Sequence, residues 1–336
     1  MQSKTNRQWI LSRRPEGDIK DGDLVLKESP IPKPGEGEVL VRTTYLSLDP
    51  TNRIWMSDMD QYMDPVNVGD AMRGVSSGEV VESRSAAFKP GDKVMTLGSW
   101  SDYYTAPAAA LQHAPKLPGL DFRDIFGIFY LVGPTAYFGL VDIGAPKIGE
   151  TLVVSTAAGA VGSIVGQLGK ALGCRVVGIA GGRDKCAWIT GELGFDAAID
   201  YKSENVAAAL KKHCPAGIDV YFDNVGGDIL DAVIGQMNLF GRVAECGLIS
   251  MYNATGIVHG PGNYPRILMK RLKIQGFIVI DYMARYPEAF RALYALYQQG
   301  KLKWKLHEVQ GLENADKAVR LLYTGGNTGK LLVKVS

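Results

Sequence analysis

An apolar segment that runs directly into a small-residue turn and a helical pattern constrains the fold of this chain more than any other feature. The segment reads Thr151-Leu-Val-Val-Ser-Thr-Ala-Ala-Gly-Ala-Val-Gly162, with Ala157 where the first glycine of such turns often stands. Small residues let a backbone approach a pyrophosphate closely, and the start of a helix supplies N–H groups and a favourable dipole. The pattern predicts a dinucleotide-binding turn, and the alternative interpretation is a turn that serves structure alone.

Strands and helices alternate on both sides of this turn. A helical pattern at Thr135–Gly144 comes before it, and another at Pro287–Gln299 ends the series. The predicted strands are Glu150–Ser155, Arg175–Ala180, Ala197–Asp200, Asp219–Asp223, Gly241–Glu245 and Ile274–Ile280, and the helices between them are Val161–Leu172, Arg183–Glu192, Asn205–His213 and Gly227–Met237. Alternation at this length predicts an α/β fold with a Rossmann-type doubly wound parallel sheet.

The first third of the chain has a different rhythm, with short strands broken by glycine and proline turns. Glu38–Tyr45 and Gly78–Glu82 are predicted strands, and Phe88–Met95 is a turn that leads into another. This pattern predicts a mainly-β, barrel-like domain, to which Thr328–Val335 returns as a terminal strand. The predicted boundaries are 1–126 plus 300–336 for a catalytic domain and 127–299 for the dinucleotide-binding domain.

Composition narrows the classes of function. Hydrophobic residues make up 46% of the 336 residues, enough for a large core, and a formal net charge of +2 without a basic run argues against a nucleic-acid partner. Residues 1–14 lack the apolar region of a secretory signal. Glycines interrupt the uncharged stretch Thr151–Gly169, and this interruption favours a buried strand–turn–helix over a membrane span. We therefore expect a cytoplasmic protein without a membrane partner.

The cysteines and histidines give no pattern typical of a metal site. They are far apart, no CxxC pair occurs, and free thiols in a reducing compartment are the favoured interpretation. The residues are Cys174, Cys186, Cys214 and Cys246, with His113, His213, His259 and His307.

The end of the second predicted strand indicates which nicotinamide cofactor is bound. NAD sites usually place an acidic residue there to bind the ribose 2′-hydroxyl. Here the strand ends in Gly181-Gly-Arg-Asp-Lys185, so that Arg183 and Lys185 stand where a 2′-phosphate would need cations. Asp184 is a counter-signal, and a solvated charged helix start is the alternative. The pattern favours NADPH.

The chain carries three motifs together, Ala157–Gly162, Tyr221–Gly227 and Cys246–Thr255, supported by Tyr45–Pro50, Gly311–Ala315 and Gly326–Lys330. With these motifs it resembles one branch of the medium-chain dehydrogenase/reductase superfamily. That branch holds the prostaglandin reductases, the plant alkenal double-bond reductases and the bacterial NADPH-dependent curcumin reductases. The resemblance covers essentially the whole chain and implies a Rossmann domain inserted into a GroES-like catalytic domain, with NADPH, no zinc and a homodimer.

The resemblance also implies the residues that hold the cofactor. It places Gly159, Ala160, Val161 and Gly162 at the pyrophosphate and Lys185 and Tyr201 at the adenosine 2′-phosphate. On the nicotinamide side it places Asn224, Cys246, Gly247, Leu248, Ile249, Ser250, Tyr252, Phe277, Ile278, Val279 and Asn327. Zinc-dependent relatives need thiolates in the first domain, whereas no cysteine precedes Cys174 here.

The expected reaction is reduction of a C=C bond conjugated to a carbonyl, by hydride transfer to the β-carbon. Negative charge then develops on the carbonyl oxygen, and the resemblance makes Tyr252 the candidate hydrogen-bond donor to it. The alternative for Tyr252 is aromatic packing in a loop.

Two departures from the branch lie near the expected substrate cleft. Relatives commonly carry an aromatic residue, Met and Arg where this chain has Thr51-Asn52-Arg53, and Pro-Gly where it has Gly133-Pro134. Substrate preference therefore stays open. A zinc-free NADPH quinone oxidoreductase of the same superfamily and a non-catalytic NADPH sensor are the competing functions.

Overall fold

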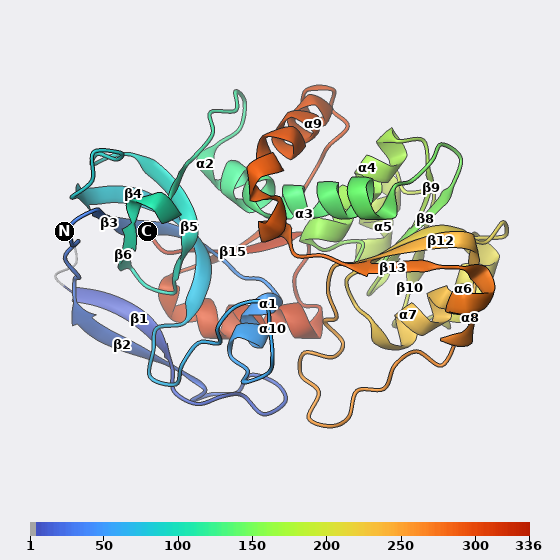
Figure 1. The fold of residues 1–336 in the computed structure, drawn as a ribbon, viewed down its shortest axis with the longest axis horizontal. Helices are drawn as coiled ribbons and strands as arrows, with labels where there is room; N and C mark the ends of the chain where they lie inside the picture. The colour runs from blue at the N-terminus through green and yellow to red at the C-terminus, as the bar shows by residue number, and fades with distance from the viewer. Residues whose placement is uncertain (1–4) are drawn as a thin grey trace. The chain divides into compact units, whose positions relative to one another are not determined.

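The computed structural model describes residues 5–336, which divide into two compact units (Figure 1). The β-rich unit comprises the chain up to Gly127 together with Leu306–Asn327 and Leu331–Ser336. The Rossmann unit comprises Ile128–Lys305 and Thr328–Lys330.

The β-rich unit is built on a seven-stranded sheet in the order β14-β15-β3-β4-β5-β7, with β6 also paired to β3. The predicted terminal strand forms β15 and pairs antiparallel with β3, Leu332 opposite Ser47. The strands are β3 (Glu38–Ser47), β4 (Arg73–Ser83), β5 (Lys93–Ser99), β6 (Tyr103–Pro107), β7 (Gln112–His113), β14 (Leu306–Gln310) and β15 (Lys330–Lys334), and a separate hairpin joins β1 (Thr5–Leu11) to β2 (Leu24–Pro30).

Alternation along these strands makes the core of the β-rich unit. Val39 and Val41 of β3 point to one face and are fully buried with Val80, Val94 and Tyr104, as the two-residue period of a strand requires. Short helices border the sheet: α1 (Thr51–Trp55), η1 (Ala108–Ala110), α2 (Phe122–Asp124), η5 (Leu312–Asn314) and α10 (Ala315–Thr324).

The Rossmann unit has a six-stranded sheet in the order β10-β9-β8-β11-β12-β13, and its neighbouring strands are parallel. This is the doubly wound order, which reverses direction between β8 and β11. Its strands are β8 (Thr151–Val154), β9 (Arg175–Ala180), β10 (Ala197–Asp200), β11 (Ile218–Asp223), β12 (Met237–Glu245) and β13 (Lys273–Gly276).

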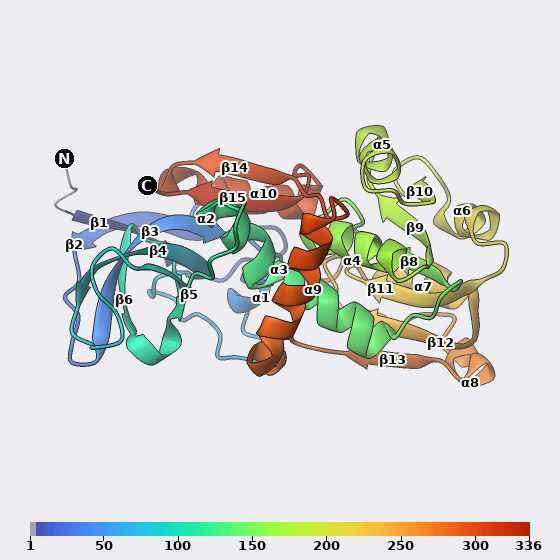
Figure 2. The same cartoon turned by 90° about the horizontal axis from the view of Figure 1, so that it is seen from above.

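Helices cover both faces of this sheet. α4 and α5 lie on one face with α3, and α6 and α7 lie on the other (Figure 1), while α9 packs beside α3 (Figure 2). Their bounds are α3 (Val132–Phe138), α4 (Ala160–Ala171), α5 (Arg183–Gly191), α6 (Val206–His213), α7 (Gly227–Ile234), α8 (Pro265–Lys270) and α9 (Tyr286–Gln298), with π-helical turns η2 (Ile125–Tyr130) and η3 (Gly139–Gly144) and the 3₁₀ turn η4 (Val279–Arg285).

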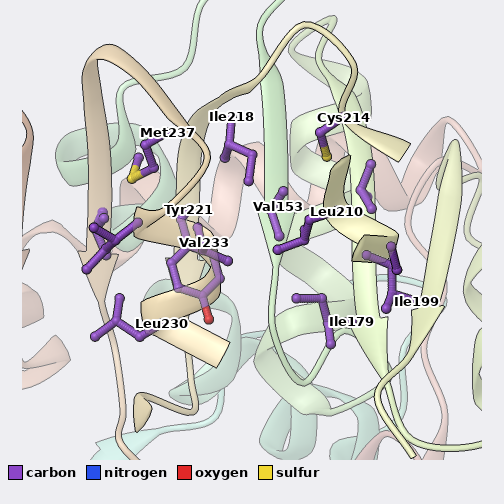
Figure 3. Packing of buried hydrophobic residues seen from close by; sticks show 14 of the residues in the cluster. Val153, Ile179, Ile199, Leu210, Cys214, Ile218, Tyr221, Leu230, Val233 and Met237 are labelled. Carbon is purple, nitrogen blue, oxygen red and sulfur yellow. The ribbon is translucent and has the colours of Figure 1, made fainter. Parts of the chain in front are cut away.

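The core under α6 and α7 is apolar and continuous (Figure 3). Val153, Ile179 and Ile199 come from three neighbouring strands, and Leu210 and Val233 come from the two helices that cover them. The Tyr221 side chain lies in the same cluster with no exposed surface. Burial of this face fixes the strand order and so the positions of the turns that follow each strand.

The stretch Phe122–Gly144 is long and apolar enough to cross a membrane by length and composition alone. Of its most apolar window, 72% is buried, and Gly139 explains part of this packing. A Cβ at Gly139 would lie 2.4 Å from the Phe277 ring and 2.6 Å from the Phe222 ring. The stretch therefore packs as a core helix does.

Several predicted elements have different ends in the structure, and in two of them the packing shows why. The strand predicted over Ile274–Ile280 ends at Gly276, because the following Phe277 turns inward to meet the Phe222 and Tyr282 rings edge-on. The helix predicted to Met237 ends at Ile234, since Met237 pairs with Ile218 as the first residue of β12. In both cases a tertiary contact overrides the local pattern.

Candidate functional site

The predicted cofactor residues of the Rossmann unit gather at one edge of its sheet. Gly159–Gly162 follow β8, Lys185 lies in the first turn after β9, Tyr201 follows β10, Asn224 follows β11 and Cys246–Tyr252 follow β12. Carboxyl ends of parallel strands share an edge, and ligands of open α/β sheets bind there.

The turn after β8 is shaped by its backbone. Thr156 adopts a left-handed conformation with φ of 49°, and Gly159 caps the start of α4. A Cβ at Gly162 would lie 2.4 Å from the Thr156 carbonyl oxygen, so that only glycine fits without a shift of the turn. The first N–H groups of α4 have no intrahelical acceptor, and the turn is therefore suited to a pyrophosphate.

A second chain segment is fixed to this turn. The Gly329 N–H donates to the Ala158 carbonyl at 2.8 Å, and the Lys330 N–H donates to the Lys305 carbonyl at 3.0 Å. Gly329 has φ of 69°, and a Cβ there would lie 2.1 Å from the Lys305 oxygen. Asn327 belongs to the β-rich unit, and its role at the nicotinamide ribose stays a prediction.

Two lysine ammonium groups repel each other where the 2′-phosphate is predicted. Partial burial and, second, repulsion from the Lys202 charge lower the pKa of Lys185. The Tyr201 ring covers Gly181, where a Cβ would lie 2.9 Å from the ring. Arg183 is exposed. Mutual repulsion between two cations is relieved by a dianion, so the pair fits a phosphate.

Asp200 anchors the same corner. Its carboxylate accepts the Gly182 N–H at 2.7 Å, and this bond is the main reason that its pKa lies below the ordinary value. The Ser203 hydroxyl and the Lys202 N–H also donate to it. The bonds hold the Lys202 backbone beside the start of α5.

Asn224 bridges β8 and β11, where the sheet changes direction. Its N–H donates to the Ser155 hydroxyl and its side-chain amide donates to the Ser155 carbonyl, both at 2.8 Å. The bonds connect the end of the phosphate turn to the start of the nicotinamide-side residues.

Below this bridge lies a buried acidic cluster. Asp223 is fully buried and accepts hydrogen bonds from Ser155, Tyr221, Val225 and Gly226. The Glu245 residue lies opposite it in the register of β11 and β12. Burial, followed by the Asp223 charge, raises the pKa of Glu245 to about 8.

Cys246 follows this cluster directly. Burial is the main cause that raises the pKa of its thiol to about 12, and the Asp223 and Glu245 charges add to it. Cys246 is thus a neutral packing residue at neutral pH rather than a nucleophile.

Tyr252, the predicted catalytic residue, folds back onto the turn that carries it. Its hydroxyl oxygen accepts the Leu248 N–H at 3.0 Å, and its oxygen is close enough that a Cβ at Gly247 would lie 3.2 Å away. A phenol that accepts one hydrogen bond can donate another. Within the same turn, the Ser250 hydroxyl donates to the Val225 carbonyl at 2.6 Å, which connects it to the residues after β11.

Phe277, Ile278 and Val279 lie half-buried after β13, with Phe277 against Phe222. The Val279 carbonyl accepts the Tyr286 hydroxyl at 3.4 Å. These residues end the row of predicted cofactor contacts in the Rossmann unit.

The two departures from the branch have clear local structures. In the β-rich unit, the Tyr62 hydroxyl lies 2.5 Å from that of Thr51 and accepts the Trp55 indole N–H at 3.0 Å. In the Rossmann unit, a Cβ at Gly133 would lie 2.5 Å from Leu293, while the Thr135 hydroxyl donates to the Leu131 carbonyl. Each departure is accommodated by its own neighbours.

Ser155, Asp223, Glu245 and Lys202 were not among the predicted site residues. Each stands in the sequence at or just after the end of a predicted strand, and that position is the signal that could have identified them. Across the residues from 5 to 336, no group of three or more His, Cys, Asp or Glu side chains is arranged to hold a metal ion.

Comparison with known proteins gives two family matches. Residues 7–114 match the family described as the N-terminal domain of oxidoreductase, and residues 160–297 match the family described as zinc-binding dehydrogenase.

Individual relatives match over nearly the full length. The NADPH-dependent curcumin reductase of Escherichia coli is 42% identical over 100% of this chain and 98% of its own length. The NADP⁺-dependent 2-alkenal reductase of Nicotiana tabacum is 38% identical over 99% of this chain and 98% of its own length. The crystal structure of CurA from Vibrio vulnificus with NADPH superposes with a TM-score of 0.93 at 43% identity, over 98% of this chain and 99% of that one.

Proposed function

Because this chain belongs to the medium-chain dehydrogenase/reductase superfamily, in the branch of the curcumin, alkenal and prostaglandin reductases, we propose that it is an NADPH-dependent reductase of enones and enals. The reaction saturates a C=C bond conjugated to a carbonyl. The observation that carries the proposal is Tyr252, a phenol held by the Leu248 N–H on the turn after β12, at the sheet edge where the phosphate turn also lies.

The residues present fit NADPH. The phosphate turn leaves a space at Gly162 that a Cβ would fill, and the first turn of α4 supplies N–H donors for the pyrophosphate. Lys185 and Lys202, whose charges act on each other, supply cations for the 2′-phosphate. NADPH, when bound, supplies the hydride that the β-carbon of the substrate receives. Asn224 and Cys246–Tyr252 would hold its nicotinamide end.

The chain's own contribution is to stabilise the charge that develops on the substrate. As the β-carbon gains hydride, the carbonyl oxygen becomes an enolate oxygen, and Tyr252 donates its phenolic hydrogen bond to it. A proton at the α-carbon completes the saturated product. The bond from Leu248 limits the rotation of the phenol, so that less entropy is lost when the donor acts.

The test is a panel of acceptors with the purified protein. An enal, an enone, a diarylheptanoid dienone and a quinone are each mixed with NADPH, with NADH as the cofactor control, and product masses are measured. We expect NADPH consumption with a gain of two hydrogens in the enal and the enones, and much less with NADH. Consumption with the quinone alone would assign the protein to the quinone oxidoreductases, and NADPH binding without consumption would favour a sensor.

We also propose that two copies form a homodimer through the edge of the Rossmann sheet. β13 is the last strand of that sheet, and Leu268 and Met269 beside it are 71% and 64% exposed. An exposed strand edge can pair with the same edge of a second copy related by a two-fold axis, and such pairing would cover the apolar side chains.

The dimer is tested by light scattering after size-exclusion chromatography. The double variant Leu268→Glu/Met269→Glu is expected to be monomeric, and Ile148→Glu, which also places a charge at a highly exposed apolar position, is the control. A monomeric wild-type protein would contradict the proposal.

We place the protein in the cytoplasm. Its four cysteines form no disulfide in the structure, which suits a reducing compartment. Cell fractionation followed by immunoblotting is the test, and recovery with an oxidising compartment or a membrane pellet would contradict this location.

A further inference from the structure

Two carboxyl groups face each other at the ends of neighbouring strands beneath the nicotinamide-side turns. Asp223 is the last residue of β11, Glu245 is the last residue of β12, and the register places them directly opposite each other. Asp223 has no exposed surface. One carboxyl oxygen of Glu245, Oε1, is buried without a hydrogen-bond partner among the described residues, and the Asp223 charge acts on the Glu245 carboxyl.

Hydrogen-bond donors surround the Asp223 carboxyl. Asp223 Oδ1 accepts from the Tyr221 hydroxyl at 2.7 Å, the Val225 N–H at 2.8 Å, the Gly226 N–H at 3.0 Å and the Ser155 hydroxyl at 3.1 Å. Several donors on one oxygen favour the carboxylate form. Two carboxylates opposite each other in a buried register would repel, so the proton of the pair resides on Glu245.

No positive charge offsets this pair. The titratable groups that act on one another here are Asp223, Glu245, Tyr221 and Cys246, and no Lys or Arg of residues 5–336 is among them. A second negative charge would therefore be repelled by the first in a buried setting, where repulsion is strong. Burial and this charge raise the pKa of Glu245 to about 8.

Asp223 holds both nicotinamide-side turns. The Asp223 side chain holds the N–H groups of Val225 and Gly226 before α7, and its main-chain carbonyl accepts the N–H groups of Cys246 and Gly247 at 2.9 and 3.2 Å. The next N–H along, that of Leu248, donates to Tyr252. A displacement of Asp223 would move Asn224, Cys246 and the Tyr252 turn together.

We propose that Asp223 and Glu245 share a single proton and act as a positioning pair that fixes the two nicotinamide-side turns for NADPH binding. The proposal rests on the proposed function, since that function places the nicotinamide at these turns. Neither carboxyl touches the reacting atoms. Loss of the shared proton places two charges side by side, loosens the turns and weakens NADPH binding at alkaline pH.

The first test needs no cofactor. Infrared difference spectra of the protein without NADPH are recorded between pH 7 and pH 10, and the carboxylic-acid C=O band is followed for the wild type and for Glu245→Gln. We expect a band that disappears as the pH rises in the wild type and is absent at every pH in Glu245→Gln. Absence of such a band from the wild type, or its persistence in the variant, would overturn the proposal.

The second test measures the dissociation constant of NADPH by nucleotide fluorescence over the same pH range. If NADPH binding raises the pKa of the pair by one unit, linkage predicts that the wild type binds NADPH about tenfold more weakly at the alkaline end of the range. Glu245→Gln, which keeps a hydrogen-bond donor without a titrating proton, is expected to show a clearly smaller change. Comparison of the two proteins removes the contribution of Lys185, which both contain.

Glu36→Gln is the matched control, because the Glu36 side chain is 86% exposed and lies in the β-rich unit. It should follow the wild type. Equal pH dependence in the wild type and Glu245→Gln would overturn the positioning role. Because these readouts require no turnover, failure to reduce any enone would count against the proposed function and not against the pair.

Discussion

The turn after β8 and the turns after β11 and β12 stand at the same edge of one sheet, yet they are built by different means. The first is shaped by backbone conformation and by the absence of side chains, with Thr156 left-handed and Gly162 in contact with it. The second set is held by side chains, through Asn224, Asp223, Glu245 and Tyr252. The first should therefore respond to added volume and be indifferent to pH, whereas the second should respond to the loss of polar atoms and to protonation.

The largest expected effect is on the side-chain turns. Tyr252→Phe removes the proposed donor to the enolate oxygen, and loss of one such donor typically costs about 10²–10³ in turnover. Steady-state kinetics with an enone should show this loss in kcat. Fluorescence titration should show an NADPH affinity within about threefold of the wild type, because the loss of one neutral hydrogen bond costs little. Unchanged kcat would remove Tyr252 from the mechanism.

The backbone turn is tested by Gly162→Ala. The new Cβ would lie 2.4 Å from the Thr156 oxygen, and an overpacking cost of about 1–3 kcal/mol corresponds to roughly 5- to 150-fold weaker NADPH binding. The weakening should be the same at pH 7 and pH 9. Gly191→Ala is the control, because nothing lies within 4 Å of a Cβ there. If both variants bind NADPH like the wild type, the turn does not hold the pyrophosphate.

The same contrast explains how far the sequence predicts the structure. The order of strands and helices in the Rossmann unit follows from apolar runs and glycine positions, because features set by the backbone have a fixed spacing in the sequence. Strand β9, for example, has the predicted bounds. The returning strand β15 was also predicted, and it pairs with β3. Such features depend on local conformation and burial, which a single sequence records.

Features that depend on side-chain contacts between distant residues were not predicted. Asp223 and Glu245 are 22 positions apart, and only the register of β11 and β12 brings them together. The Lys202 charge acts on Lys185 for a similar reason, since the strands that precede them, β10 and β9, are neighbours. The end of β13 was placed too late because Phe277 packs against Phe222. Spacing alone does not contain this information.

A smaller effect is expected at the cationic corner. Lys202→Ala should weaken NADPH binding by roughly threefold to tenfold and leave NADH binding unchanged, since an exposed charge that meets a phosphate contributes modestly. Parallel titrations with both nucleotides measure it, with Lys212→Ala, exposed in the last turn of α6, as the control. An equal loss for the two nucleotides would show that Lys202 does not recognise the 2′-phosphate.

The smallest expected effect is on stability. The pKa of Glu245 is raised in the folded protein from 4.5 to about 8, so its contribution to folding is complete below about pH 4.5 and is lost as the pH rises through 8. Glu245→Gln lacks this loss. The melting temperature of Glu245→Gln minus that of the wild type should therefore increase by roughly 3 °C from pH 5 to pH 9. This figure assumes that folding raises the pKa of Glu245 by one unit. A constant difference in thermal scans would contradict the shared proton.

The most direct test of the central claim follows the transferred hydrogen itself. Purified protein is given an enone with NADPH deuterated at the transferable position of C4, and the product is analysed by NMR and mass spectrometry. We predict a saturated ketone with one deuterium at the β-carbon. Deuterium on the carbinol carbon of an unsaturated alcohol would show that the carbonyl is reduced instead, and would contradict the assignment of this chain as a double-bond reductase.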